Sequence, residues 1–481
     1  MRKNRILLRF AVLALAVSLV YWSGPIGSFA SEQTGASDTF QVLHSFDGTD
    51  GANPWRSLIL YGGNLYGMTF SGGHYGYGTI FEFNTETGKL TTLLSFDGKD
   101  DGQNPYGSLI LSGENLYGMT SAGGHLGWGG GTIFEFDTEA GQFTTSYVFY
   151  YQDYISSCGC YDNWYKGATP WGTLMLSGTN LYGTTTYGGA IWNDENPNGY
   201  GTIFEFNIET GQLTTLHSFD GTDGSSPQGN LILYGGNLYG TTYYGGTNDN
   251  GTILEFNTKT GKLTTLHRFD GTDGACPHGG LTLYGENLYG TTVEGGAYRS
   301  KYWGNGFGTI FELNAKTGKF ETVHNFAGYP KDGAQPWDNL MLSGENLYGT
   351  TALGGANSTG DYPNGCGTIF QFNAKTGKLT TLHSFDETHG SEPHGSLILS
   401  GENLYGMTYS GGASGAGVIF SCPLKINGAC GSANGESFLK APTSDLCEAG
   451  EASAVTGKGP WKWTCEGING GTTEKCSAKL K

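Results

Sequence analysis

The sequence predicts an all-β fold: a seven-bladed β-propeller of four-stranded antiparallel blades closed by its N-terminal strand, followed by a small β module stapled by disulfides. The tetrapeptide Asn-Leu-Tyr-Gly occurs seven times, and consecutive copies begin 50 to 65 residues apart, which is the length of a propeller blade. Glycine (84 residues) and aromatic residues (14%) are abundant while charged residues (14%) are few, which is typical of short strands joined by glycine turns. The copies begin at Asn64, Asn115, Asn180, Asn237, Asn287, Asn346 and Asn403.

Each repeat holds four segments in which apolar and polar residues alternate, as expected of half-buried strands. In the first repeat they are 57–61, 64–69, 78–83 and 89–96. We expect the Leu and Tyr of the motif to pack on opposite faces between neighbouring blades, and its Gly to permit close backbone approach. A histidine recurs in the fourth strand of five blades, which favours a structural role over a ligand role; these are His44, His217, His267, His324 and His383.

The two ends of the repeat array predict how it closes. The chain enters with a lone fourth strand at 40–46, and the seventh repeat supplies three strands within 396–422 but no fourth. An open array would leave two unpaired sheet edges, whereas pairing 40–46 with 418–422 removes them.

The recurring blocks also resemble a known family. The pattern SLILYGGNLYGMT, GTIFEFN and LTTL-x-SFDG over about residues 40–426 is similar to the GloVer (Gloeo/Verruco) tandem repeats of bacterial surface proteins. The resemblance implies an extracellular, propeller-like protein, often with a C-terminal anchor or sorting module, and it brings no established activity and no catalytic residues. The seventh repeat departs from the pattern with GVIFSC, and the second with FTTSYVFYY.

The beginning of the chain indicates export. Residues 1–30 have a basic start, an apolar run and a Ser-Phe-Ala cleavage pattern, which predicts a signal peptide, with a retained anchor as the alternative. We expect no membrane span after cleavage and a monomer that is secreted, extracellular or on the cell surface, with the periplasm as an alternative. The net charge of −18 argues against nucleic acid and anionic membranes as partners.

Residues 427–481 form a separate region after the propeller domain at 31–426. Its four cysteines predict a disulfide-stapled β module, and it resembles small modules of exported bacterial proteins that share the GPWxWxC pattern. Among three possible pairings we prefer Cys430–Cys476 with Cys447–Cys465, because the first would join the ends of the module. A zinc site is the alternative, although the spacings lack C-x2-C pairs.

The other five cysteines lie in the repeat region. Cys158 and Cys160 predict a loop disulfide, with a redox or metal role as the alternative. Because the total of nine cysteines is odd, at least one thiol lacks an intramolecular partner, and Cys422 is the natural candidate as a small buried hydrophobe.

A ligand site must use residues that the repeat does not dictate. In every repeat a Pro and one variable residue precede the innermost strand, and we expect these seven variable side chains to ring the mouth of the central channel. The aromatic members would stack on a sugar ring or apolar side chain and the polar members would hydrogen-bond, with packing between blades as the alternative. They are Trp55, Tyr106, Trp171, Gln228, His278, Trp337 and His394.

A second contact is predicted in the basic and aromatic loop at 293–307, through Arg299, Tyr302 and Trp303. A merely solvated loop is the alternative. The expected partner of the protein is a carbohydrate or an extracellular protein.

No catalytic, metal or cofactor residue is assigned. Calcium at the FDGTDG turns is an alternative that ordinary Asp-Gly turn chemistry makes unnecessary. The runner-up function is a glycoside hydrolase or polysaccharide lyase that uses two nonrepeating loop carboxylates. The candidates are Asp194, Glu195, Asp332, Asp338, Asp361, Glu387 and Glu392.

Overall fold

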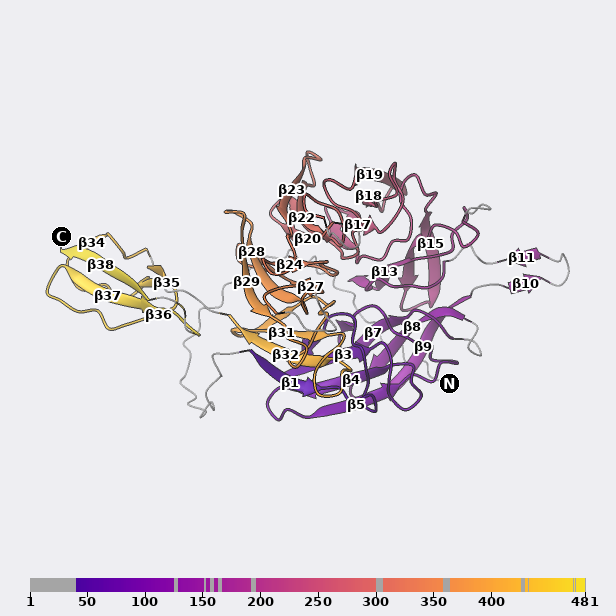
Figure 1. Ribbon diagram of the computed structural model, residues 1–481, viewed down its shortest axis with the longest axis horizontal. Coiled ribbons are helices and arrows are strands. Elements are labelled where there is room, and N and C mark those ends of the chain that lie inside the picture. Colours follow the sequence, from indigo (N-terminus) through magenta and orange to yellow (C-terminus); the bar gives the residue numbers. More distant parts are fainter. Residues whose placement is uncertain are drawn as a thin grey trace, which may run out of the picture. The chain divides into compact units, whose positions relative to one another are not determined.

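The computed structural model describes residues 40–124, 129–150, 153–155, 160–162, 167–191, 196–299, 306–357, 364–424, 429–430, 432–469, 471 and 473–480. Every regular element in these ranges is a β-strand (Figure 1). None of the described residues belongs to a helix long and apolar enough to cross a membrane. The predicted signal peptide at 1–30 lies outside the described residues.

Six four-stranded antiparallel sheets follow one another along the described part of the repeat region, each with its strands in sequence order. Sheet 1 contains β2 (Ile59–Tyr61), β3 (Asn64–Thr69), β4 (Thr79–Asn84) and β5 (Leu90–Ser95); sheet 2 contains β6 (Ile110–Ser112), β7 (Asn115–Thr120), β8 (Gly129–Asp137) and β9 (Gln142–Tyr150); sheet 3 contains β12 (Met175–Ser177), β13 (Asn180–Thr185), β14 (Thr202–Asn207) and β15 (Gln212–Ser218). Sheet 4 contains β16 (Ile232–Tyr234), β17 (Asn237–Thr242), β18 (Thr252–Asn257) and β19 (Lys262–Arg268); sheet 5 contains β20 (Thr282–Tyr284), β21 (Asn287–Thr292), β22 (Thr309–Asn314) and β23 (Phe320–Asn325); sheet 6 contains β25 (Met341–Ser343), β26 (Asn346–Thr351), β28 (Thr368–Asn373) and β29 (Lys378–Ser384).

The seventh sheet joins the two ends of the repeat region. It contains β30 (Ile398–Ser400), β31 (Asn403–Thr408) and β32 (Val418–Pro423), and its fourth strand is β1 (Gln41–Ser45). The indigo β1 lies antiparallel beside β32, with Gln41 opposite Ser421 and Ser45 opposite Val418 (Figure 1). Two small pairs accompany the sheets, β10 (Asp153–Ile155) with β11 (Cys160–Asp162) and β24 (Gly333–Ala334) with β27 (Leu353–Gly354).

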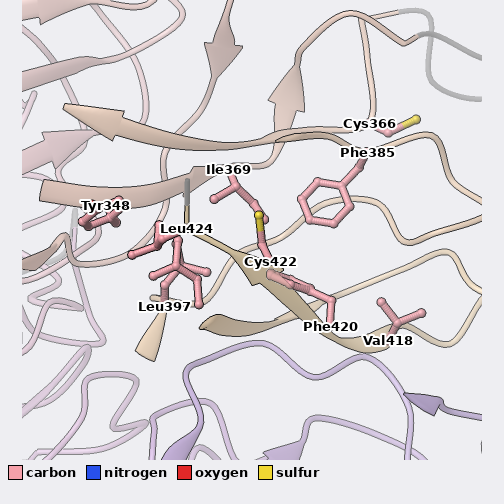
Figure 2. Close-up of a cluster of buried hydrophobic side chains, with 10 residues drawn as sticks. Tyr348, Cys366, Ile369, Phe385, Leu397, Val418, Phe420, Cys422 and Leu424 are labelled. Atoms are coloured by element: carbon pink, nitrogen blue, oxygen red, sulfur yellow. The ribbon is translucent and has the colours of Figure 1, made fainter. Parts of the chain in front are cut away.

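The core consists of buried clusters between consecutive sheets, not one central core. The cluster between sheets 6 and 7 contains Ile369 and Phe385 together with Val418, Phe420 and Cys422 (Figure 2). Equivalent clusters join sheets 1 and 2, 2 and 3, 3 and 4, 4 and 5, and 5 and 6. A further cluster joins sheet 7 to sheet 1 through Phe46, Met407, Ile419, Leu58, Leu65 and Phe81.

The Asn-Leu-Tyr-Gly motif supplies contacts to both neighbouring sheets. Leu65 is fully buried in the cluster toward sheet 7, and Tyr66 is buried in the cluster toward sheet 2, which confirms the predicted opposite faces. The Asn64 amide and the Tyr66 hydroxyl both donate to the carboxylate of Glu82 on β4, the latter at 3.3 Å. The motif therefore couples strands within a sheet and sheets within the array.

The motif glycine differs from the expectation. A Cβ at Gly67 would lie 2.5 Å from Phe81 Cζ, so what occupies the space above this glycine is an aromatic ring and not backbone. In sheet 4 the corresponding Phe is replaced by Leu254, whose nearest atom lies 3.9 Å from a Cβ built at Gly240. There the closest atom is the movable Leu231 Cδ2, at 2.7 Å.

The C-terminal residues form a four-stranded sheet, β34 (Ser437–Phe438), β38 (Glu474–Leu480), β37 (Trp461–Glu466) and β36 (Glu451–Ala452), and a short pair, β33 (Ala429–Cys430) with β35 (Cys447–Ala449). Disulfides join Cys430 to Cys476 and Cys447 to Cys465, which confirms the preferred pairing. The zinc alternative is wrong, because all four sulfurs are bonded to one another in pairs. Trp461 and Trp463 fill the small core beside the disulfides.

We expect Gly67→Ala to destabilise the protein by about 2 kcal/mol, because the added methyl group overlaps a fully buried Phe81 ring. The matched control is Gly240→Ala, which should cost less than about 1 kcal/mol because a leucine end can move aside. Urea unfolding of the two variants measures the difference. Equal losses would show that the ring is not what requires glycine at this position.

Candidate functional site

The seven connections that lead into the first strand of each sheet share one backbone geometry. In each, the residue before the Pro has a positive φ between 52° and 56° although none is glycine; these are Asn53, Asn104, Thr169, Ser226, Cys276, Gln335 and Glu392. Non-glycine residues other than Asn and Asp rarely adopt this left-handed conformation, so five of the seven must be held in it by their surroundings. All seven connections therefore present the residue after the Pro from an equivalent backbone.

Hydrogen bonds to the residues beside two strands hold this geometry. The Asn53 N–H donates at 2.8 Å to Ala416 O, just before β32, and Asn53 O accepts at 3.2 Å from Phe70 N, just after β3. The same two bonds recur in the other six connections. Each variable residue is consequently anchored between two sheets.

The variable side chains meet at one place. Trp55 lies 4.8 Å from Tyr106 and 4.3 Å from His394, measured between ring centroids. Tyr106 stacks on Trp171 at 4.7 Å. Trp337 lies 4.8 Å from His278 and 5.3 Å from His394.

In two of the seven connections the residue directly after the variable one is charged, and these two charged residues complete the assembly. Arg56 and Asp338 follow Trp55 and Trp337, and their side chains form an ion pair of 2.8 Å between Nη1 and Oδ1, each with 2% exposed. Arg56 Nη2 also donates to Gln228 O at 3.1 Å. We define the central cluster as these two residues together with Trp55, Tyr106, Trp171, Gln228, His278, Trp337 and His394.

Burial divides the central cluster. Tyr106, Gln228, His278 and His394 are buried, whereas Trp55, Trp171 and Trp337 keep part of their surface exposed. Burial and the Arg56 charge lower the pKa of His278 well below its ordinary value and that of His394 to about 3, so both imidazoles are neutral near pH 7. The predicted residues are brought together, but four of them are packed more deeply than a channel mouth requires.

Glycines directly after the variable residues explain why the variable side chains lie so close together. At the position of Arg56 and Asp338, the other five repeats carry glycine; these are Gly107, Gly172, Gly229, Gly279 and Gly395. A Cβ at Gly229 would lie 2.7 Å from Gly279 O, and one at Gly395 would lie 2.6 Å from Arg56 O. The ion pair could have been predicted from the sequence, because only two repeats replace this glycine and the two replacements carry opposite charges.

The residues that follow Arg56 and the equivalent glycines link neighbouring connections by hydrogen bonds. Ser57 N donates to Ser108 Oγ at 3.0 Å and Ser108 N donates to Thr173 Oγ1 at 2.9 Å, each acceptor lying in the connection into the following sheet. Ser396 N, in sheet 7, donates to Ser57 Oγ and to Asp338 Oδ2, both at 2.9 Å.

The FDGTDG turns have structural partners for their carboxylates. Asp47 Oδ1 accepts from the backbone and hydroxyl of Thr49, and Asp50 Oδ2 lies 2.7 Å from His44 Nε2. The histidine contact recurs at His217 with Asp223, His267 with Asp273 and His324 with Asp332. These contacts confirm a structural role for four strand histidines and account for the motif without calcium.

Three repeats break this pairing. In sheet 2, Tyr147 stands at the position of the histidine. Leu94 takes the place of the histidine before Asp101, and burial together with the Asp97 carboxylate raises the pKa of Asp101 to about 7. In sheet 6, His383 stacks on Phe40 at 3.8 Å, and its buried Nε2 has no hydrogen-bond partner.

The remaining predicted site residues are placed only in part. Arg299 is exposed, and its backbone forms an isolated antiparallel β-bridge with Gly306. Tyr302 and Trp303 lie outside the described residues. Cys158 also lies outside them, so the Cys158–Cys160 disulfide stays a prediction. Cys422 is buried in the cluster between sheets 6 and 7.

Comparison with known proteins gives one sequence match. The model of the Gloeobacter/Verrucomicrobia repeat matches residues 27–190, 154–303 and 299–434. No curated protein sequence matches the chain.

Similar solved structures include an oligogalacturonate lyase in complex with manganese, at 12% identity and a TM-score of 0.49, covering 80% of this chain and 93% of that one. The extracellular domain of a protein described as a hybrid two-component system from B. thetaiotaomicron has 11% identity and a TM-score of 0.48, covering 89% and 47%. A nidogen/laminin complex has 15% identity and a TM-score of 0.39, covering 67% and 96%. With TM-scores below 0.5, these likenesses support no argument about this chain.

Removing one member of the buried ion pair should be costly. We expect Asp338→Asn to destabilise the protein by about 3 kcal/mol, because it leaves the Arg56 charge buried without a counter-ion. The double variant Arg56→Met with Asp338→Asn should recover at least about 1 kcal/mol of that loss. Denaturant unfolding of the four proteins of this cycle gives the coupling, and additive losses would show that the pair contributes no mutual stabilisation.

Proposed function

The chain belongs to the Gloeobacter/Verrucomicrobia repeat family, and from this premise we propose that it is an extracellular seven-bladed β-propeller that binds carbohydrate at its central cluster. Residues 31–426 would form the propeller and residues 427–481 a separate module. Two disulfides support an oxidising compartment outside the cytoplasm.

Ring closure is supported by contacts that connect sheet 7 with sheet 1. β1 completes sheet 7, a buried cluster joins the two sheets, and Ser396 N donates to Ser57 Oγ. In a closed ring, each sheet has a neighbour on both faces, and only short, protected strand edges remain.

Deleting residues 31–47 from the mature protein tests closure. The truncation removes β1 and Phe46, so it should expose the edge of β32 and cause aggregation or a large fall in melting temperature. Size-exclusion chromatography and thermal melting measure this. A truncated protein that stays monomeric with an unchanged melting temperature would contradict closure.

Carbohydrate binding rests on one observation: the seven residues that vary at an otherwise constant position assemble into one cluster with partly exposed indole rings. Indole faces stack well on the apolar faces of sugar rings, and nearby polar groups give orientation. A protein side chain is the second candidate ligand, because the same surface suits apolar groups.

The enzyme alternative is less well supported by the described acids. Asp338 is paired with Arg56, and Asp332 accepts hydrogen bonds from the Ala327 and Gly328 N–H groups and contacts His324. Both carboxylates therefore have structural partners, and the Glu392 carboxylate accepts from Ser410 Oγ at 2.9 Å. Asp194, Glu195 and Asp361 lie outside the described residues.

A glycan array followed by calorimetry on the mature protein tests the proposal. Trp171→Ala removes a stacking ring worth about 1 to 3 kcal/mol, so affinity for a bound glycan should fall at least about tenfold. Trp171→Phe, which keeps an aromatic face, should retain most of the affinity. Release of reducing ends from the bound glycan would favour the enzyme alternative, and normal binding by Trp171→Ala would move the site away from the central cluster.

A further inference from the structure

Unpartnered polar atoms concentrate in the central cluster. Nine buried side-chain nitrogen or oxygen atoms in the described residues have no hydrogen-bond partner, and five of them belong to this cluster. Buried polar groups are nearly always paired, so a concentration of exceptions calls for a polar partner such as a water molecule or a ligand group. The five atoms are Trp55 Nε1, Arg56 Nε, His278 Nε2, Trp337 Nε1 and His394 Nδ1.

The hydrogen-bonding roles of these atoms can be assigned from chemistry. Arg56 Nε and Trp337 Nε1 carry hydrogens and can only donate. Trp55 Nε1 is also a donor, but it interacts with the Tyr106 side chain: burial raises the pKa of the Tyr106 hydroxyl, and Trp55 offsets part of that rise. We therefore rely on the other four atoms.

His278 Nε2 has the opposite role. Its partner nitrogen, Nδ1, lies 3.0 Å from Trp337 O, which can only accept, and 3.4 Å from Arg56 Nη2, which can only donate. We assign the hydrogen to Nδ1 because the contact with the carbonyl is the shorter of the two. In the neutral imidazole this leaves Nε2 as a bare acceptor. His278 is 1% exposed, so this acceptor is in the interior of the cluster and not on its rim.

Charge adds a further condition. The guanidinium of Arg56 is already neutralised by Asp338, so the cluster offers no unbalanced positive charge to an anion. Sulfate, carboxylate and halide groups accept hydrogen bonds but do not donate them. Such a group would place negative charge against the lone pair of His278 Nε2.

We infer that the central cluster is selective for neutral, hydroxyl-rich sugars, with His278 Nε2 accepting a hydroxyl hydrogen and Trp337 Nε1 and Arg56 Nε donating to hydroxyl oxygens, directly or through one water. This inference rests on the proposed function, whose ligand class it narrows. A hydroxyl group both donates and accepts, which matches a site that holds donors and an acceptor together. His394 Nδ1 can serve either role, depending on its tautomer.

The test compares neutral with acidic oligosaccharides on the mature protein. Calorimetry would use hexamers of glucose (β1,4- and α1,4-linked) and of mannose as neutral probes and a galacturonate hexamer as the acidic probe. We expect at least one neutral hexamer to bind at least tenfold more tightly than the galacturonate hexamer. Tighter binding of the acidic hexamer would overturn the inference and leave carbohydrate binding intact.

His278→Asn tests the assigned acceptor. Asparagine can keep the donation to Trp337 O, but it has no atom at the position of Nε2, so affinity for the neutral hexamer should fall at least about tenfold. The matched control is His383→Asn, since His383 Nε2 is also buried without a partner but lies on β29 beside Phe40, and affinity should be unchanged.

The outcomes separate the two proposals. If Trp171→Ala abolishes binding while His278→Asn, with a normal melting temperature, binds as the wild type does, the cluster binds sugar but the acceptor assignment is wrong. If no hexamer binds the wild-type protein, the carbohydrate proposal fails together with the inference. The wild-type preference for neutral over acidic hexamers needs no variant, so it decides the ligand class even if His278→Asn does not fold.

Discussion

The buried ion pair between Arg56 and Asp338 is the constraint on which the centre of this molecule depends. It joins sheet 1 to sheet 6, the same guanidinium binds Gln228 O from the connection into sheet 4, and the same carboxylate accepts from Ser396 N of sheet 7. A buried pair of this kind is weak evidence for stability, because desolvation offsets most of the attraction. Its physical consequence is geometric: four connections must stay in register for both charges to remain satisfied.

Around this pair, constant and variable residues have separate tasks. The constant ones set the backbone: the Leu and Tyr of each motif fill two different clusters, and the glycine admits a Phe ring. The left-handed residue before each Pro then directs one variable side chain to the centre. Chemical variety is thus confined to a position where it does not disturb the contacts between sheets. The unpartnered nitrogens of His278 and Trp337 lie at that position.

Sequence patterns predicted contacts well where one local rule governs them. Alternation placed Leu65 and Tyr66 on opposite faces, the strand count predicted that β1 would lie beside β32, and four cysteines in a short segment predicted the two C-terminal disulfides. Patterns were less informative about which group occupies the space beside a given residue. Gly67 was expected to face backbone, but it faces Phe81. His383 was grouped with four paired histidines, although the residue corresponding to their aspartate partner is His389 in its repeat.

The sequence by itself determined the repeat, its four-strand content and the seven positions free to vary, because periodicity and turn chemistry act over a few residues. Only the tertiary structure decided that Asp338 is a partner of Arg56 and not a candidate catalytic acid, since 282 positions separate them and no local pattern connects them. The depth of His278 and His394 was decided in the same way. Burial depends on how sheets converge, and five glycines at the neighbouring position let the inner backbones approach until those side chains are enclosed.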